Sequence, residues 1–162
     1  MPQKSEKTPF YASGLRFSCE RCSGCCRYDS GYVFLSRKDT TRMAAALNMG
    51  CEEFAGIFCR WISVGNGLAH LSLKEKSNFD CVLWTINAGE GGGCSVYNER
   101  PLQCRAFPFW PSMLASRESW EAAAGDCPGM GKGSFYSYNS INNLINEWQA
   151  MRKNEPIMSR RV

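Results

Sequence analysis

Ten of the 162 residues are cysteines, whereas only His70 is a histidine. The cysteine content, about 6%, is below that of short secreted chains built on disulfides. The N-terminal segment MPQKSEKTPFYASG lacks the apolar stretch of a secretory signal, so we expect a cytoplasmic protein in a reducing compartment. Patterned cysteines there bind metals or carry out redox chemistry more often than they form structural disulfides. The single histidine excludes sites with two cysteine and two histidine ligands.

The composition is that of a folded chain. Hydrophobic residues make up 44% and aromatic residues 12%, which is enough to build a core. The apolar runs are too short to span a bilayer, so no membrane association is expected. Eight thiolates would more than cancel the formal net charge of +4, and the basic residues are sparse. Charge therefore argues against a nucleic-acid surface.

Four cysteines form a CxxCxxCC run, made of Cys19, Cys22, Cys25 and Cys26. Two-residue gaps let successive sulfurs turn toward one centre, as in zinc ribbons and iron–sulfur loops. Gly24 is expected to supply the backbone bend that the third ligand needs. Because adjacent side chains diverge, we expect Cys25 and Cys26 to serve different centres, or one of them to bridge or pack.

A second, more dispersed group contains Cys81, Cys94, Cys104 and Cys127. Three glycines precede Cys94, and Pro128 and Gly129 follow Cys127. Glycine and proline recur beside metal-binding cysteines because the sulfur accepts N–H bonds from a tight turn. The two groups together provide eight candidate ligands. Cys51 and Cys59 lack such turn residues, so we expect both to be small buried hydrophobes.

The predicted elements are short. They are strands over 31–35, 68–73 and 81–85, helices over 36–50 and 52–60, a helical turn over 100–104, and a C-terminal helix with an apolar stripe at Ile141, Leu144, Ile145, Trp148 and Met151. Ser36 and Asp39 have the spacing of a helix N-cap. We therefore expect an α+β fold, a small irregular metal-stapled single domain with short strands and about three helices. A flexible N-terminal segment over 1–14 and a basic tail over 152–162 would flank the cysteine domain at 15–151, and residues 158–162 of the tail are expected to fray.

Three motifs in order carry a family resemblance. They are Phe17-x-Cys19-x-x-Cys22-x-Gly24-Cys25-Cys26, then Gly31-x-Val33-x-Leu35-Ser36-x-x-Asp39, then Cys94-x-Val96-Tyr97-x-x-Arg100-Pro101-x-x-Cys104-Arg105-x-Phe107-Pro108. Together they resemble the YkgJ-like cysteine-cluster family, whose domain is described as zinc- or iron-chelating. The resemblance covers residues 15–130 and implies metal chelation. Flagellin lysine N-methylases carry a similar cluster, but this chain is too short to add a separate cofactor-binding domain.

An all-thiolate ligand set suits both zinc and iron–sulfur clusters. The CxxCxxC spacing favours an iron–sulfur cluster or iron, because three ligands of a cubane can be completed by a distant cysteine before a proline, such as Cys127. Zinc is the alternative, because eight cysteines divide into two closed four-thiolate sites. A disulfide or redox switch is a third possibility.

Arg100 and Arg105 flank Cys104, and we expect them to contact the groups that bind the metal without binding it themselves. The competing interpretation is that Arg100 holds a turn by pairing with Asp39 or Glu99. Asp39 itself is interpreted as a helix-start residue, and His70 as a packed or surface histidine.

Three functional hypotheses follow from the sequence. The first is a metal-binding protein that chelates iron–sulfur, iron or zinc through eight thiolates, with a protein partner in addition. The second is an iron–sulfur redox or protein-modifying, methylase-like enzyme or accessory. The third is a structural zinc module that binds nucleic acid or protein. No residue is assigned a catalytic role, and the sequence gives no basis for an oligomeric state.

Overall fold

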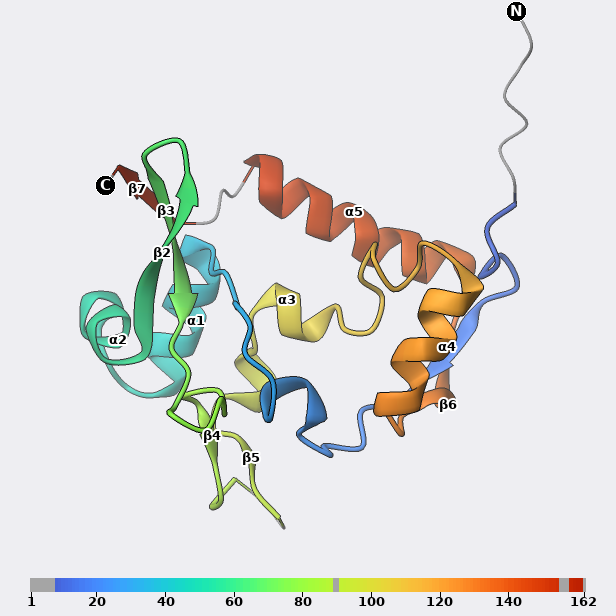
Figure 1. The fold of residues 1–162 in the computed structure, drawn as a ribbon, viewed down its shortest axis with the longest axis horizontal. Coiled ribbons are helices and arrows are strands. Elements are labelled where there is room, and N and C mark those ends of the chain that lie inside the picture. Colours follow the sequence, from blue (N-terminus) through green and yellow to red (C-terminus); the bar gives the residue numbers. More distant parts are fainter. Residues whose placement is uncertain (1–7, 89–90, 155–157, 162) are drawn as a thin grey trace, which may run out of the picture. The chain divides into compact units, whose positions relative to one another are not determined.

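The structure, a computed structural model, describes residues 8–88, 91–154 and 158–161 (Figure 1). It confirms the α+β class, with five α-helices in the described residues rather than about three. The helices are α1 (Arg37–Ala46), α2 (Cys51–Phe58), α3 (Leu102–Arg105), α4 (Arg117–Asp126) and α5 (Tyr138–Asn154). The strands are β1 (Leu15–Phe17), β2 (Cys59–Gly65), β3 (Leu68–Leu73), β4 (Trp84–Thr85), β5 (Gly93–Cys94), β6 (Met130–Tyr136) and β7 (Ser159–Arg161), and two 3-10 turns are η1 (Gly24–Cys26) and η2 (Tyr97–Glu99).

The chain divides into two compact units. Unit 1 contains the described part of Met1–Glu20 together with Pro108–Asn146. Unit 2 contains Arg21–Phe107 and the described part of Glu147–Val162. Residues 1–7 of the predicted flexible segment, and residues 155–157 and 162 of the predicted tail, lie outside the described residues.

Unit 1 is organised around Phe109, which is buried. Its ring packs against Trp120 of α4 at 5.9 Å, Tyr136 of β6 at 4.6 Å and Phe17 of β1 at 6.1 Å between ring centroids. Strands β1 and β6 pair in an antiparallel manner beside it. Helix α4 was not predicted from the sequence, although the hydroxyl of Ser116 accepts a hydrogen bond from the Ser119 amide and caps its N-terminus.

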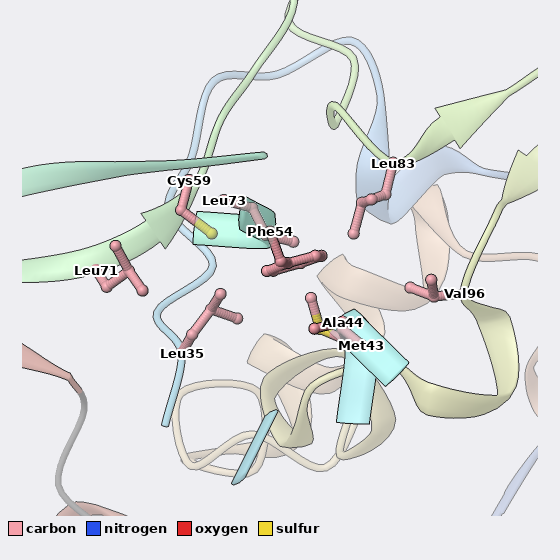
Figure 2. Close-up of a cluster of buried hydrophobic side chains, with 9 residues drawn as sticks. All are labelled: Leu35, Met43, Ala44, Phe54, Cys59, Leu71, Leu73, Leu83 and Val96. Atoms are coloured by element: carbon pink, nitrogen blue, oxygen red, sulfur yellow. The ribbon is translucent and has the colours of Figure 1, made fainter. Parts of the chain in front are cut away.

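Unit 2 has its own hydrophobic core, which α1, α2 and the β2–β3 hairpin build (Figure 1). Figure 2 shows the ring of Phe54, which α2 supplies, among eight other buried side chains. Two of them, Leu83 and Val96, lie two residues after Cys81 and Cys94. The core therefore holds in place the segments that carry these two candidate ligands.

The N-terminus of α1 confirms the capping prediction. The Ser36 hydroxyl accepts a hydrogen bond from the Asp39 amide at 3.1 Å, and the Ser36 amide donates to the Asp39 carboxylate at 3.1 Å. The second carboxylate oxygen of Asp39 accepts a hydrogen bond from the Leu102 amide at 3.1 Å, a contact that the sequence spacing did not predict. One buried carboxylate thus joins the start of α1 to the start of α3.

Backbone pairing differs from the prediction at two predicted strands and the tail. The predicted strand 31–35 is not a strand of a sheet, although it forms an isolated bridge between Phe34 and Ser72 and backbone hydrogen bonds with Leu71 and Leu73 of β3. The amide of Leu71 donates to Met158 at 2.8 Å, and β7 pairs with β3, so residues 159–161 are ordered rather than frayed. In the predicted strand 81–85 only β4 has strand geometry, because the Cys81 amide bonds to the carbonyl of Cys26 at 2.8 Å.

The other predicted elements agree with the structure within four residues, and the largest difference is at α1, which ends four residues before the predicted 50. β3 matches its prediction, α2 ends two residues early, and α3 begins at Leu102 after Pro101. In the apolar stripe of α5, Ile141 is fully buried and the next three members are half-buried, while the side chain of Met151 lies outside the description. Among the described residues no helix combines the length and the apolar character needed to cross a membrane.

The Glu75 carboxylate joins the loop before α1 to strand β2 within unit 2. It accepts hydrogen bonds from the Gly31 amide at 2.5 Å, the Ser30 hydroxyl at 3.1 Å and the Arg60 guanidinium at 2.8 Å. The bond from the Gly31 amide, together with those from Ser30 and Arg60, lowers the pKa of Glu75 below its usual value.

Because this pKa is lowered on folding, the stabilisation is complete above the unfolded pKa of about 4.3 and is lost as the pH falls through the folded pKa. We expect Glu75→Gln to reduce the free energy of unfolding by about 1–2 kcal/mol at pH 7 and to flatten its decline below about pH 4. Urea unfolding of the metal-free protein, followed by tryptophan fluorescence at several pH values, measures both effects. Glu121→Gln, at an exposed position of α4, is the control. If the free energy of unfolding of Glu75→Gln declined below about pH 4 as steeply as that of the wild type, the expectation would be wrong.

Asp39→Ala removes the cap of α1 and leaves the Leu102 amide without its buried acceptor. We expect Asp39→Ala to lower the free energy of unfolding by about 2–4 kcal/mol. The missing cap accounts for about 1 kcal/mol and the unpaired buried amide for about 1–3 kcal/mol. Hydrogen exchange at the Leu102 amide should accelerate in Asp39→Ala. Ser36→Ala is the matched control, because it removes only a cap contact and leaves the Leu102 bond intact. Equal Leu102 protection in the wild type and Asp39→Ala would refute the role given to Asp39.

Candidate metal centre

The two units share the eight candidate cysteines unequally. Cys19 and Cys127 belong to unit 1, and the other six belong to unit 2, namely Cys22, Cys25, Cys26, Cys81, Cys94 and Cys104. None of the ten cysteines, all of which are described, forms a disulfide. The six thiols of unit 2 are therefore available as ligands.

The loop that carries Cys22, Cys25 and Cys26 has an unusual backbone. Arg21 has φ 52° and Ser23 has φ 65°, which are left-handed conformations, whereas Gly24 lies in the turn η1 without a positive φ. The prediction that Gly24 supplies the bend is therefore wrong, and the bend falls on its neighbours. Left-handed backbone costs a non-glycine residue energy that other contacts must offset.

Contacts of Ser23 offset that cost. Its carbonyl accepts a hydrogen bond from the Cys26 amide at 3.1 Å, and its hydroxyl accepts one from the Trp84 indole at 3.0 Å. Trp84 in β4 stands opposite Cys94 in β5, so the same side chain fixes the loop and neighbours a second cysteine. The sequence alone did not reveal this hydrogen bond, because Ser23 and Trp84 are 61 residues apart.

Separate elements bring the remaining thiols of unit 2 to the loop. The Cys81 amide donates to the Cys26 carbonyl at 2.8 Å, and the Arg27–Asp80 ion pair at 2.9 Å lies beside that bond. Cys94 ends the short strand β5, and Cys104 lies in α3, whose first amide is held by Asp39. Four segments far apart in the sequence thus each contribute at least one thiol.

Five of these thiols are close enough to act on one another's charge. This thiol cluster consists of Cys25, Cys26, Cys81, Cys94 and Cys104. Within it, a hydrogen bond between the adjacent thiols lowers the pKa of Cys25 and raises that of Cys26, and burial also raises that of Cys26. Burial raises the pKa of Cys81, Cys94 and Cys104. Without a cation, most of the thiol cluster is therefore held in its neutral form.

Arginines and one carboxylate border the thiol cluster. The Arg27 guanidinium donates to Asp80, which lowers the pKa of Asp80, and stacks on Trp84 at 3.8 Å from the ring centroid. Arg100 acts electrostatically on three of the thiols, those of Cys25, Cys94 and Cys104. The sequence pointed to neither Asp80 nor Ser23, because their roles depend on partners 53 and 61 residues away.

The two arginines predicted to support the metal have different surroundings. Arg100 pairs with neither Asp39 nor Glu99, since Asp39 binds amides and Glu99 pairs with Arg42 at 2.7 Å. Arg105 donates to the carbonyl of Arg100 at 3.0 Å and approaches Glu147 at 3.9 Å. Arg100 thus acts directly on thiols, whereas Arg105 contacts the backbone that holds Arg100.

Three residues predicted to lie outside the site have distinct environments. Cys59 is buried in the core of unit 2, as predicted, and burial raises its pKa to about 12. The same prediction is wrong for Cys51, which is exposed at the start of α2 with Thr41 nearby. His70 is a packed histidine, in edge contact with Phe34 and 2.8 Å from the Ser159 hydroxyl.

The donor chemistry of the thiol cluster suits a soft metal. Sulfur ligands of this kind select zinc, copper(I) and iron–sulfur centres over magnesium or calcium. Across residues 8–88, 91–154 and 158–161, however, no three histidine, cysteine, aspartate or glutamate side chains are already arranged to hold an ion. A bound metal would therefore have to draw the sulfurs inward from their present positions.

Comparison with known proteins agrees with this donor chemistry. No solved structure matches the chain. A family model named CxxCxxCC, with the description "Putative zinc- or iron-chelating domain", matches residues 18–128, which is more than half of the chain. The matched range includes all eight candidate ligands, from Cys19 to Cys127. The chain therefore belongs to the CxxCxxCC family.

Proposed function

We propose that this protein chelates zinc or iron through cysteine thiolates, with the thiol cluster as the ligand set of unit 2. The observation that carries the proposal is the gathering of five thiols from four separate segments without any disulfide. Cys19, Cys22 and Cys127 remain expected ligands from their spacing and from their place in the matched family range.

Thiols are weak hydrogen-bonding groups, so five neighbouring thiols gain little from one another as neutral side chains. As thiolates they repel each other, and each is costly to bury. A divalent cation or an iron–sulfur cluster reverses this balance, because it deprotonates coordinating thiols and neutralises their charge.

The choice between metals follows from the same ligands. Four thiolates close a zinc site without an open position, which would give the metal a structural role. Iron–sulfur clusters use the same thiolates, and we favour an iron–sulfur or iron centre because of the CxxCxxC spacing. We further propose a reducing, cytoplasmic setting, in which the thiols stay available.

The test is metal analysis of protein purified without oxygen, together with its absorption spectrum. We expect stoichiometric metal in the wild type, a strong loss in Cys104→Ser, and no change in Cys51→Ser. Cys104 is a half-buried member of the thiol cluster, whereas Cys51 is exposed and outside it, so Cys51→Ser controls for the loss of any thiol. Brown protein with iron would identify an iron–sulfur centre, and colourless protein with zinc would identify the closed structural site. Equal metal content in both variants would refute the ligand assignment.

A further inference from the structure

The Arg27–Asp80 ion pair has an exposed aromatic residue beside each of its members. Tyr28 follows Arg27, Phe79 precedes Asp80, and the two aromatic residues are 64% and 50% exposed. Both adopt left-handed backbone, with φ 76° at Tyr28 and φ 66° at Phe79. This conformation is unfavourable for a bulky side chain, so the surrounding contacts must maintain it. The fold thus keeps two aromatic side chains in solvent, although burying them would stabilise the protein.

Hydrogen bonds and stacking hold these two residues at one junction within unit 2. The Asp80 carboxylate accepts a hydrogen bond from Arg27 Nε at 2.9 Å, and the Asp80 carbonyl accepts one from the Lys76 amide at 2.8 Å. The Phe79 amide donates to the Lys76 carbonyl at 3.0 Å, which closes the turn that carries the exposed ring. The Arg27 guanidinium lies 4.8 Å from the centroid of the Tyr28 ring. The positions of both aromatic residues are therefore set by the same ion pair.

Trp84 connects this junction to further polar groups. The Arg27 guanidinium lies 3.8 Å from the centroid of the Trp84 ring, and the Lys76 ammonium lies 5.6 Å from it. Lys76 also donates to the carbonyl of Trp84 at 2.5 Å. The Trp84 indole donates to the hydroxyl of Ser23, two residues after Arg21 in the chain. One indole thus joins the junction to the loop that carries Arg21.

The described part of unit 2 contains cations here that no carboxylate neutralises. Arg21 and Arg100 stack on the ring of Tyr97, at 4.1 Å and 3.8 Å from its centroid. Among the described residues, neither of these arginines nor Lys76 forms an ion pair, and the exposed carboxylate of Asp29 forms none either. An aromatic face fixes a cation without cancelling its charge, so all three cations stay available to an anion.

We propose that this face of unit 2, which we call the stacking surface, binds single-stranded nucleic acid. Tyr28 and Phe79 stack on unpaired bases, while Arg21, Lys76 and Arg100 contact phosphates. The inference goes beyond the proposed function and does not depend on which metal the thiol cluster binds.

The chemistry of the stacking surface selects this partner. A single strand offers flat base faces together with phosphates, which match exposed rings and unpaired cations. An acidic peptide would satisfy the cations but leave the rings in water, and a duplex keeps its base faces stacked inside. Composition argued against such a surface because basic residues are sparse along the chain, whereas folding places Arg21 and Arg100 on the same ring.

The experiment measures the fluorescence anisotropy of labelled oligo(U) and oligo(dT), each of about 12 nucleotides, with protein purified without oxygen. Tyr28→Ala and Phe79→Ala should each weaken binding by about 10-fold, as expected for the loss of one base–aromatic stack. Tyr28→Trp should retain the affinity, because it keeps a flat ring. Phe135→Ala is the matched control, since Phe135 is an exposed aromatic residue of unit 1 with Arg16 over its ring. Binding of either oligonucleotide supports the inference, and the tighter one distinguishes RNA from DNA.

Salt dependence tests the phosphate contacts. Lys76→Gln and Arg21→Gln should each lower the slope of log affinity against log salt concentration by about 0.7, the value for one phosphate contact on a single strand. Arg42→Gln should leave the slope unchanged, because Arg42 pairs with Glu99. Slopes equal to that of the wild type in both Lys76→Gln and Arg21→Gln would refute these contacts.

Three outcomes would overturn the inference. They are the absence of binding to both oligonucleotides, equal affinity of the wild type and the double variant Tyr28→Ala/Phe79→Ala, and displacement of the oligonucleotide by polyglutamate at the same concentration of charge. The last outcome would assign the surface to an acidic polypeptide. Metal content is measured in the same samples, so a failure of chelation and a failure of nucleic-acid binding are recorded separately.

Discussion

The hydrogen bond from the Cys81 amide to the Cys26 carbonyl, 2.8 Å long, is the contact on which the thiol cluster depends. It joins the cysteine loop to a segment 55 residues away, and the Arg27–Asp80 ion pair reinforces it from the adjacent positions. Because Arg27 also stacks on Trp84, the same junction fixes the indole that binds Ser23. Backbone pairing, ion pair and ring contact therefore converge at the place where the two cysteine groups of unit 2 meet.

The hydrophobic core supports this junction from the other side. Leu83 and Val96 are buried with Phe54, and each follows a candidate ligand by two residues (Figure 2). Two half-buried members of the thiol cluster, Cys81 and Cys94, pack against this core. The core sets the path of the backbone at these positions.

The arginines of unit 2 differ in the groups that they contact. Most arginines near the core of unit 2 are neutralised within the protein, and Glu75 shows how closely a carboxylate can be engaged, with three donors around it. Arg21 and Arg100 depart from this pattern, because both stack on the ring of Tyr97.

The sequence by itself determined the features that depend on near neighbours: the cap formed by Ser36 and Asp39, strand β3, the apolar face of α5, and the cysteine spacing that indicates a metal-chelating family. Hydrogen bonds and periodicities over three or four residues can be read from the chain alone. The tertiary structure decided which thiols meet, that Cys51 is exposed, and that Arg21 rather than Gly24 takes the strained backbone. It also decided that Arg105 donates a hydrogen bond to the carbonyl of Arg100. These outcomes depend on contacts between residues dozens of positions apart, where packing and electrostatics override local preference.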